Sequence, residues 1–340
     1  MKGKEKRTIY ALSSIILAVI VFLFSLFFTE TKDVVVIQMV SPEQSSSPLD
    51  SSNSPADSSE DGGGGGKPII FTILTDQSQY IYLRQDSKGG YTGKGYHGFI
   101  GDETYYLENP TDLNPLYYLG QTLQINNRKK CKAEIELLKV ENDLLPYGLK
   151  SKKDGEKENV YTVDYYPFGN FSYDLYSALT PMTSKAEYAT QEKLYYDFVV
   201  DTYLSIPSTL KTTLLSLAKK NNLNASSDTI IYDVAHYIQN AAYYDFKYTD
   251  ESYPYDKDMV TYFLTEHKRG VCRHFAAAAT MMFRALGIPA RYAIGFSTWV
   301  DANEKLEYKG EGHAWTEIYL QGYGWVPVEV TGSTVWEGEE

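Results

Sequence analysis

Residues 270–291 read Gly-Val-Cys-Arg-His-Phe-Ala-Ala-Ala-Ala-Thr-Met-Met-Phe-Arg-Ala-Leu-Gly-Ile-Pro-Ala-Arg. The alanine-rich run, with larger apolar residues at helical spacing, predicts a helix that begins at Cys272 and ends at Gly287, with Pro289 just beyond. Cys272 is one of two cysteines in the 340 residues. A thiol in the first turn of a helix lies in the positive field of the helix N-terminus, which favours the thiolate. Cys272 is therefore a candidate nucleophile.

A predicted hairpin supplies possible partners for this thiol. Residues 313–319 and 325–329 alternate as strands around the turn Gly322-Tyr323-Gly324. Counting outward from a turn centred near residues 321–323 places His313 opposite or diagonal to Glu329, within side-chain reach. A carboxylate in that place fixes the tautomer and orientation of an imidazole, and the imidazole can activate a thiol. Cys272, His313 and Glu329 thus form a candidate acyl-transfer triad.

Four linked motifs carry a family resemblance. They are Gly270-Val-Cys272, Gly287-Ile-Pro-Ala-Arg291, Gly312-His313-Ala-Trp315-Thr-Glu317-Ile-Tyr319 and Gly324-Trp325-Val-Pro327-Val-Glu329-Val-Thr331. In this order they resemble the transglutaminase-like superfamily in its bacterial, membrane-anchored form, over about Tyr203 to Thr331. The resemblance implies a papain-like α+β fold with Cys272 as nucleophile, His313 as base and Glu329 as orienting acid. The acid of such proteins is usually Asp followed by Pro, whereas this chain has Glu329 and Val330.

Further roles in the site are expected for a few residues. The backbone N–H of Cys272 is the natural oxyanion donor. Tyr248 is proposed as the second donor, with a place in the core as the equal alternative. Trp315 is interpreted as a residue of the hairpin core, with a substrate contact as the alternative. Arg291 is expected to pin the strand that follows the helix. His274 points to another side of the helix from Cys272 and is a poor base.

No metal or cofactor is expected. Cys272, His274, His313 and Glu329 are possible zinc ligands by residue type, but their spacing lacks the paired ligands of a zinc motif. Animal members of the transglutaminase-like superfamily use calcium, but this sequence contains no calcium-loop motif.

The chain upstream of the helix is predicted to contain further parts. Residues 67–185 show short alternating apolar segments between turns, which predicts a small antiparallel β-rich domain. Within it, Cys131 begins an alternating run and shares a face with apolar residues, so we interpret it as a small buried hydrophobe rather than a bridge to Cys272. Helical periodicity begins at about Ala186, and residues 186–340 are the predicted catalytic domain.

The N-terminal residues predict a membrane anchor. Residues 9–28 form an uncharged apolar run long enough to cross a hydrocarbon core of about 30 Å. The basic residues within 1–8 place this end in the cytoplasm and the remainder outside. A cleaved signal peptide is the alternative, but the apolar run is too long and an Ala-x-Ala-like site is missing. Residues 29–66 are rich in Ser, Pro and Gly and form a predicted flexible linker.

Charge and context narrow the function. A net charge of -12 argues against a nucleic-acid partner, because binding phosphates requires a basic face. The resemblance implies an extracytoplasmic enzyme that acts through a cysteine thioester on protein or peptide amides at the cell surface or wall. A cysteine peptidase or amidase of the same fold is the alternative within enzymes. From another class comes a non-catalytic cell-surface binding module.

Overall fold

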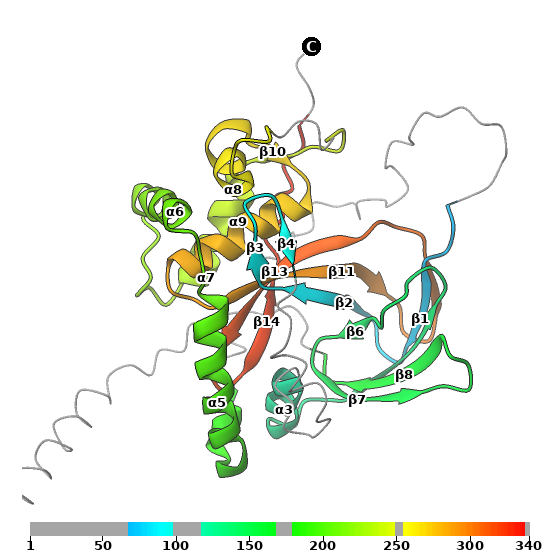
Figure 1. Ribbon diagram of the computed structural model, residues 1–340. Helices are drawn as coiled ribbons and strands as arrows, with labels where there is room; N and C mark the ends of the chain where they lie inside the picture. Colours follow the sequence, from blue (N-terminus) through cyan, green and yellow to red (C-terminus); the bar gives the residue numbers. More distant parts are fainter. Residues whose placement is uncertain (1–66, 98–116, 168–178, 249–253, 337–340) are drawn as a thin grey trace, which may run out of the picture.

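A computed structural model describes residues 67–97, 117–167, 179–248 and 254–336. These ranges form a mixed α/β fold with two five-stranded antiparallel sheets and a group of helices on one side (Figure 1). The predicted anchor at 9–28 and linker at 29–66 lie outside the described residues. Within the described ranges, no helix combines the length and hydropathy needed to cross a membrane.

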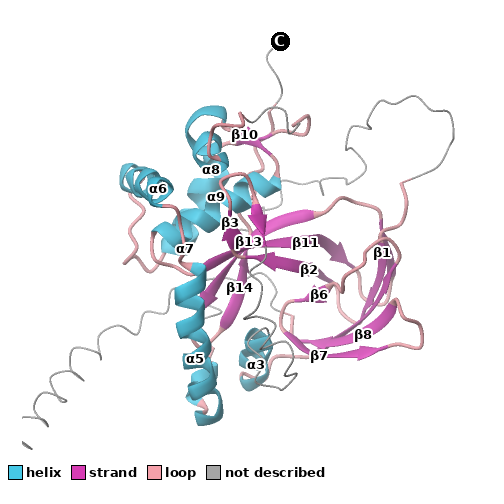
Figure 2. Cartoon of the chain, in the orientation of Figure 1, coloured by secondary structure: helices cyan, strands magenta, loops and turns pink. Residues whose placement is uncertain are grey.

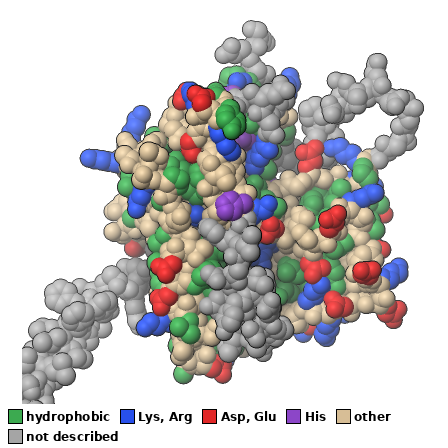
Figure 3. Space-filling view, in the orientation of Figure 1, with side chains coloured by type: hydrophobic (Ala, Val, Ile, Leu, Met, Phe, Trp, Pro, Cys, Tyr) green, Lys and Arg blue, Asp and Glu red, His purple; other side chains and the backbone are tan. Residues whose placement is uncertain are grey.

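The first sheet has the strand order β12-β1-β5-β8-β7. Its members are β1 (Phe71–Thr75), β5 (Cys131–Leu137), β7 (Leu149–Asp154), β8 (Val160–Tyr165) and β12 (Lys305–Tyr308). The predicted strand at Cys131 is present, and Cys131 is buried and unbridged. On the face of the molecule shown in Figure 3, acidic and basic side chains are interspersed over this sheet.

The second sheet carries the predicted hairpin and has the order β14-β13-β11-β2-β6. Its members are β2 (Gln79–Lys88), β6 (Leu145–Pro146), β11 (Ala290–Val300), β13 (His313–Leu320) and β14 (Gly324–Val328). Leu320 pairs with Gly324 across the turn, so the turn is centred where the sequence predicted it. In Figure 2, β2 and β11 run side by side in the centre, with β13 and β14 to their left and the strands of the first sheet to their right.

Strand pairing crosses the predicted boundary at residues 185/186. β2, from the upstream part, pairs along its length with β11, and β12, from the later part, completes the sheet that begins with β1. Ile81 and Leu83 of β2 pack in one core with Phe71 and Ile135 of the first sheet and Phe296 of β11. The β-rich region therefore does not form a core separate from that of the later residues, which corrects the prediction of a preceding domain.

The helices lie against both faces of the second sheet, because Ala314 and Ile318 of β13 pack with one group of helices and Tyr319 packs with another. They are α3 (Tyr118–Ile125), α5 (Ala186–Tyr203), α6 (Ser208–Lys220), α7 (Ile230–Ala241), α8 (Met259–Tyr262) and α9 (Cys272–Ala285), with short turns η2 (Met182–Ser184) and η4 (Phe263–His267). Two small ribbons, β3 (Gly90–Tyr91) with β4 (Tyr96–His97) and β9 (Tyr243–Tyr244) with β10 (Arg269–Gly270), lie around them. Helix α9 packs against β13 and carries the predicted nucleophile at its first residue.

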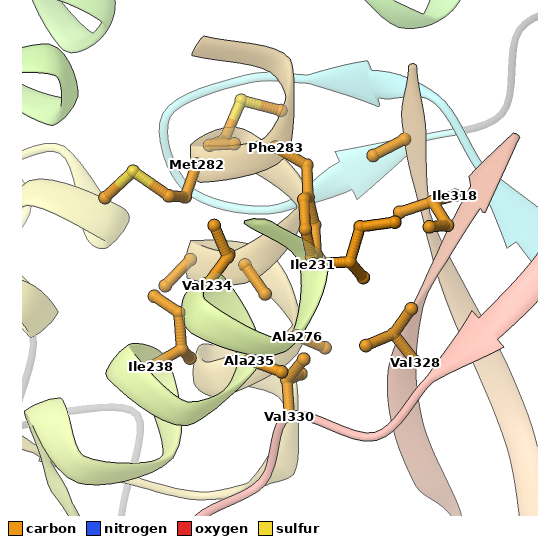
Figure 4. Packing of buried hydrophobic residues seen from close by; sticks show 14 of the residues in the cluster. Ile231, Val234, Ala235, Ile238, Ala276, Met282, Phe283, Ile318, Val328 and Val330 are labelled. Carbon is orange, nitrogen blue, oxygen red and sulfur yellow. The ribbon is translucent and has the colours of Figure 1, made fainter. Parts of the chain in front are cut away.

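The alanine run explains how closely α9 approaches the sheet. Ala276 to Ala279 are fully buried, and small side chains let a helix backbone come near its neighbours. The hydroxyl of Thr316 on β13 donates to the carbonyl of Ala276 at 3.0 Å. Figure 4 shows α7 covering α9 from the other side, with Ile231, Val234, Ala235 and Ile238 facing the helix and the sheet. The helix is thereby fixed between two layers.

Candidate active site

Cys272 owes its position to a tight entry into α9. The imidazole Nδ1 of His274 accepts the backbone N–H of Val271 at 3.1 Å, which caps the start of the helix. A Cβ at Gly270 would lie 2.7 Å from that nitrogen, so only glycine leaves room for the ring. The cap occupies His274, which is buried, and leaves the half-buried Cys272 to face the sheet.

His313 begins β13 opposite Gly295 of β11. The register between β11 and β2 shifts at Ile294/Gly295, and a Cβ at Gly295 would meet the carbonyl oxygen of Leu83 at 2.0 Å. The same Cβ would lie 3.0 Å from the ring of Trp315. Glycine at this bulge therefore lets three strands meet closely beneath His313.

The three predicted residues of the triad come together. His313 Nε2 lies 2.7 Å from Glu329 Oε2, and the imidazole also makes a hydrogen bond with the Cys272 side chain. Because Thr316 pairs with Val328 in an antiparallel register, Glu329 comes opposite Trp315 and diagonal to His313, as the hairpin count predicted. The side chains of His313 and Glu329 are 20% and 21% exposed, so the pair is largely withdrawn from water.

Glu329 uses its extra methylene to turn back toward its own backbone. Its Oε1 accepts the N–H groups of Val330 at 3.0 Å and Thr331 at 2.9 Å. Its Oε2 meets His313 and accepts the hydroxyl of Tyr82 at 2.8 Å. The carboxylate is thus held by four donors. One of its oxygens reaches the imidazole although Glu329 is one methylene longer than the Asp that is usual in the transglutaminase-like superfamily.

The pair favours its charged form. Burial alone would lower the pKa of His313, but the Glu329 carboxylate and the hydrogen bonds with Cys272 and Glu329 raise that pKa to about 10. Burial would raise the pKa of Glu329, but the imidazolium, the Thr331 N–H and the Tyr82 hydroxyl lower it to about 2. The imidazolium and carboxylate therefore coexist near neutral pH.

Trp315 does not occupy the place proposed for a substrate contact. Its side chain has no exposed surface, and its indole N–H donates to the Tyr147 hydroxyl at 2.9 Å. The ring lies under His313, with centroids 5.9 Å apart, and contacts the edge of Tyr82. Trp315 is therefore a core residue beneath the imidazole, in agreement with the core interpretation, and the alternative of a substrate contact does not hold because Tyr82 and Tyr147 cover the ring.

A buried ionic network lies beyond Trp315. Arg291 and Glu317 are both fully buried and form an ion pair between β11 and β13. The hydroxyl of Tyr147 donates to the same carboxylate, as does the hydroxyl of Ser87 at 2.9 Å. This network pins the strand after α9, which is the role that the sequence predicted for Arg291.

Tyr248, proposed as an oxyanion donor, packs edge-on against His274 and contacts the Arg273 guanidinium. Tyr244, on β9, lies closer to the expected oxyanion position, because its hydroxyl is hydrogen-bonded to the backbone N–H of Cys272. Burial, together with the nearby Cys272 side chain, raises the pKa of Tyr244 to about 12, so it keeps its proton. Sequence reasoning missed Tyr244 because nothing local marks which tyrosine lies beside Cys272.

Metal ligands do not gather in the described ranges. Among those residues, no group of three or more His, Cys, Asp and Glu side chains has the arrangement of a metal site. His274 is engaged by the helix cap and His313 by Glu329, so the two imidazoles near Cys272 already have partners.

Residues 217–330 match the sequence model of the transglutaminase-like superfamily. The chain carries a transglutaminase-like domain. All three residues of the candidate triad lie within the matched segment. A solved structure, the periplasmic domain of TgpA from Pseudomonas aeruginosa, extends the likeness in fold to 78% of this chain and 88% of that domain, with a TM-score of 0.50 and 14% identity.

Two curated proteins also resemble the chain. Protein-glutamine gamma-glutamyltransferase of Pseudomonas aeruginosa is 33% identical over 101 residues, which cover 29% of this chain and 15% of that protein. The uncharacterized protein YebA of Bacillus subtilis is 24% identical over 278 residues, which cover 74% of this chain and 37% of that protein. The match to YebA thus reaches well beyond the transglutaminase-like domain, although the chain spans less than two fifths of either relative.

Proposed function

We propose that this protein is a thiol acyltransferase that acts on glutamine side chains or peptide amides through a Cys272 thioester. The observation that carries the proposal is the continuous contact from Cys272 through His313 to Glu329. A helix-borne thiol, a buried imidazole and an orienting carboxylate are the parts that nucleophilic acyl transfer requires. The likeness of residues 217–330 to the transglutaminase-like superfamily supports the same reaction class.

The proposed acylation begins from the thiolate and the imidazolium. The Cys272 sulfur attacks the carboxamide carbon, forming the C–S bond and a tetrahedral oxyanion. His313 then gives its proton to the departing nitrogen, the C–N bond breaks, and ammonia or an amine leaves. Throughout, Glu329 keeps the imidazole oriented and compensates its charge. The products of this half-reaction are a neutral imidazole and a thioester on Cys272.

The second half-reaction runs in the opposite sense. A primary amine attacks the thioester, neutral His313 takes the proton released by the amine, and the C–S bond breaks to restore thiolate and imidazolium. A lysine side chain in the role of amine gives a cross-link between proteins. Water in the same role gives hydrolysis, which makes the protein a cysteine peptidase or amidase. The triad serves both outcomes.

The proposed oxyanion site combines two groups that already touch. The Tyr244 hydroxyl oxygen accepts a hydrogen bond from the backbone N–H of Cys272 in the structure. A substrate carbonyl oxygen that enters there accepts this N–H in place of the hydroxyl, and Tyr244 turns its own O–H toward the same oxygen. Two donors aimed at the developing charge are typical of acyl-transfer enzymes.

We propose that the reaction takes place outside the cytoplasm, with residues 9–28 as a membrane anchor and 29–66 as a tether. The charge pattern of the N-terminus supports this orientation. The similar TgpA structure is that of a periplasmic domain. The proposed substrates are proteins or peptides of the cell surface or wall.

An amine-incorporation assay tests the proposal. The full chain, in mild detergent, is incubated with a glutamine-rich protein and a fluorescent primary amine, and both incorporated label and released ammonia are measured. Cys272→Ala is the control and is expected to abolish both signals. Label in the protein supports transfer, whereas ammonia without label assigns hydrolysis. Activity that persists in Cys272→Ala would exclude the thioester mechanism.

A further inference from the structure

The phenol of Tyr82 reaches the triad from a strand far upstream in the chain. Tyr82 lies in β2, and its hydroxyl donates to Glu329 Oε2 at 2.8 Å, across a sequence separation of 247 residues. This is the same oxygen that meets His313 Nε2. Tyr82 therefore contacts the acid at the atom that orients the imidazole.

We propose that Tyr82 is a positioning residue that acts on His313 through Glu329, so that the site works as a group of four side chains. The inference rests on the proposed function only in naming Cys272 as the nucleophile. Two neighbouring backbone N–H groups hold Oε1. The Tyr82 hydroxyl adds a hydrogen bond to Oε2, so the carboxylate plane is held at both oxygens and Oε2 stays directed at Nε2.

The hydroxyl and the ring of Tyr82 make different contacts, so a substitution can remove one set and keep the other. The residue is 6% exposed, and the ring packs edge-on against Trp315 with centroids 5.2 Å apart. Tyr80 lies on the same face of β2 and contacts the ring of Tyr82. A phenylalanine at this position keeps these contacts and removes the bond to Glu329 alone. Tyr82→Phe is therefore expected to fold.

Alkylation of Cys272 by iodoacetamide gives a readout that needs no substrate. The rate at neutral pH is measured on the full chain in detergent, and mass spectrometry assigns the modified cysteine, because Cys131 is buried and should react slowly. A hydrogen bond to a charged group corresponds to about a tenfold effect or more. Tyr82→Phe is expected to slow the alkylation of Cys272 about tenfold while it retains a cooperative unfolding transition.

A double-mutant cycle decides whether Tyr82 acts through Glu329. In a Glu329→Gln background, Tyr82→Phe is expected to cause little further slowing, because the carboxylate that it positions has gone. Tyr161→Phe is the matched control, since Tyr161 is a buried upstream tyrosine whose hydroxyl donates to the Leu144 carbonyl at 2.8 Å. Its alkylation rate should equal that of the natural protein.

The outcomes separate this inference from the proposed function. Rapid alkylation in the natural protein that Tyr82→Phe leaves unchanged overturns the positioning role and leaves the triad intact. Equal slowing by Tyr82→Phe in both backgrounds also overturns it, because the effect then bypasses Glu329. A natural protein whose Cys272 reacts no faster than a free thiol contradicts the activated thiol itself, and with it the positioning role.

Discussion

The Tyr244 hydroxyl and the His313–Glu329 pair are proposed to contribute to the reaction in different ways. A hydroxyl that stabilises an oxyanion matters only when a tetrahedral centre forms, whereas a group that maintains the thiolate matters in every reaction of the thiol. Alkylation by iodoacetamide displaces iodide and forms no oxyanion. Amine incorporation and alkylation therefore report on different residues.

Tyr244→Phe is expected to reduce amine incorporation about a hundredfold, which is the usual loss when one oxyanion donor is removed. The alkylation rate of Cys272 should change by less than about threefold, because the phenylalanine keeps the ring contacts with Phe246 and Phe275. Tyr248→Phe provides the comparison and should retain most of the incorporation activity. Equal losses in the two variants would remove the basis for choosing Tyr244.

The ion pair between His313 and Glu329 also predicts a pH-dependent stability. The raised pKa of His313 gives stability that is complete below the ordinary imidazole value near 6.5 and is lost as the pH rises toward about 10. The lowered pKa of Glu329 gives stability that is present above about 4.5 and is lost as the pH falls toward about 2. The pair therefore contributes most between these limits, at about pH 5 to 6.

Glu329→Gln is expected to destabilise the protein by roughly 2 kcal/mol at pH 5.5, as for loss of a charged hydrogen bond. The difference in unfolding free energy from the parent should shrink toward pH 9.5. Urea unfolding of both proteins, measured from pH 5.5 to pH 9.5 in the presence of a reductant, gives this difference. A difference that grows with rising pH would mean that the pair does not stabilise the fold in its charged form.

At the scale of elements, the bulge at Gly295 joins the sheet to the site. A methyl group there would overlap the Leu83 carbonyl and press on Trp315, which supports His313. Gly295→Ala is expected to lower the unfolding free energy by about 2 kcal/mol or more and to slow Cys272 alkylation. Thermal unfolding and the alkylation assay measure the two effects.

Gly287→Ala is the matched control for that bulge. Gly287 ends α9 with a φ of 84°, where alanine is strained by about 1 kcal/mol, yet nothing lies within 4 Å of the added Cβ. It should therefore reduce stability without slowing alkylation. If Gly295→Ala behaved in the same way, β11 would have no special connection to the triad.

At the scale of the whole molecule, upstream and downstream segments depend on each other. Besides β2, the β3–β4 ribbon reaches the helices, where the Tyr91 hydroxyl donates to Asp258 at 2.8 Å and the Tyr96 hydroxyl donates to the Ala277 carbonyl at 3.2 Å. Removing the upstream part would uncover the long edge of β11 and the buried face of Trp315. An uncovered strand of this length is prone to aggregate.

A fragment of residues 186–340 is therefore expected to lack a cooperative unfolding transition and rapid Cys272 alkylation. Residues 67–340 should show both, because this fragment retains every described strand of the two sheets. Circular dichroism during heating and the alkylation assay compare the fragments. An independently folded and reactive 186–340 fragment would restore the division that the sequence predicted at residue 185.

Local patterns were sufficient for much of the site. The helix beginning at Cys272 and the hairpin register that brings His313 to Glu329 both follow from signals within a few residues. The fold class follows from the family resemblance, and the matched segment and the antiparallel sheets support it. Tyr82 escaped prediction because alternation identifies a strand without naming its neighbour in the sheet.

The pairing of β2 with β11 also sets an order of events during synthesis. β2 emerges from the ribosome roughly 200 residues before its partner strand, and Glu329 follows later still. Contacts of such long sequence separation form slowly, because much chain entropy is lost before they are made. The Cys272 thiol consequently meets its complete set of partners only after the residues up to Glu329 have been made and folded. A chain still in synthesis carries an unassembled site, which delays any acyl-transfer activity until folding is finished.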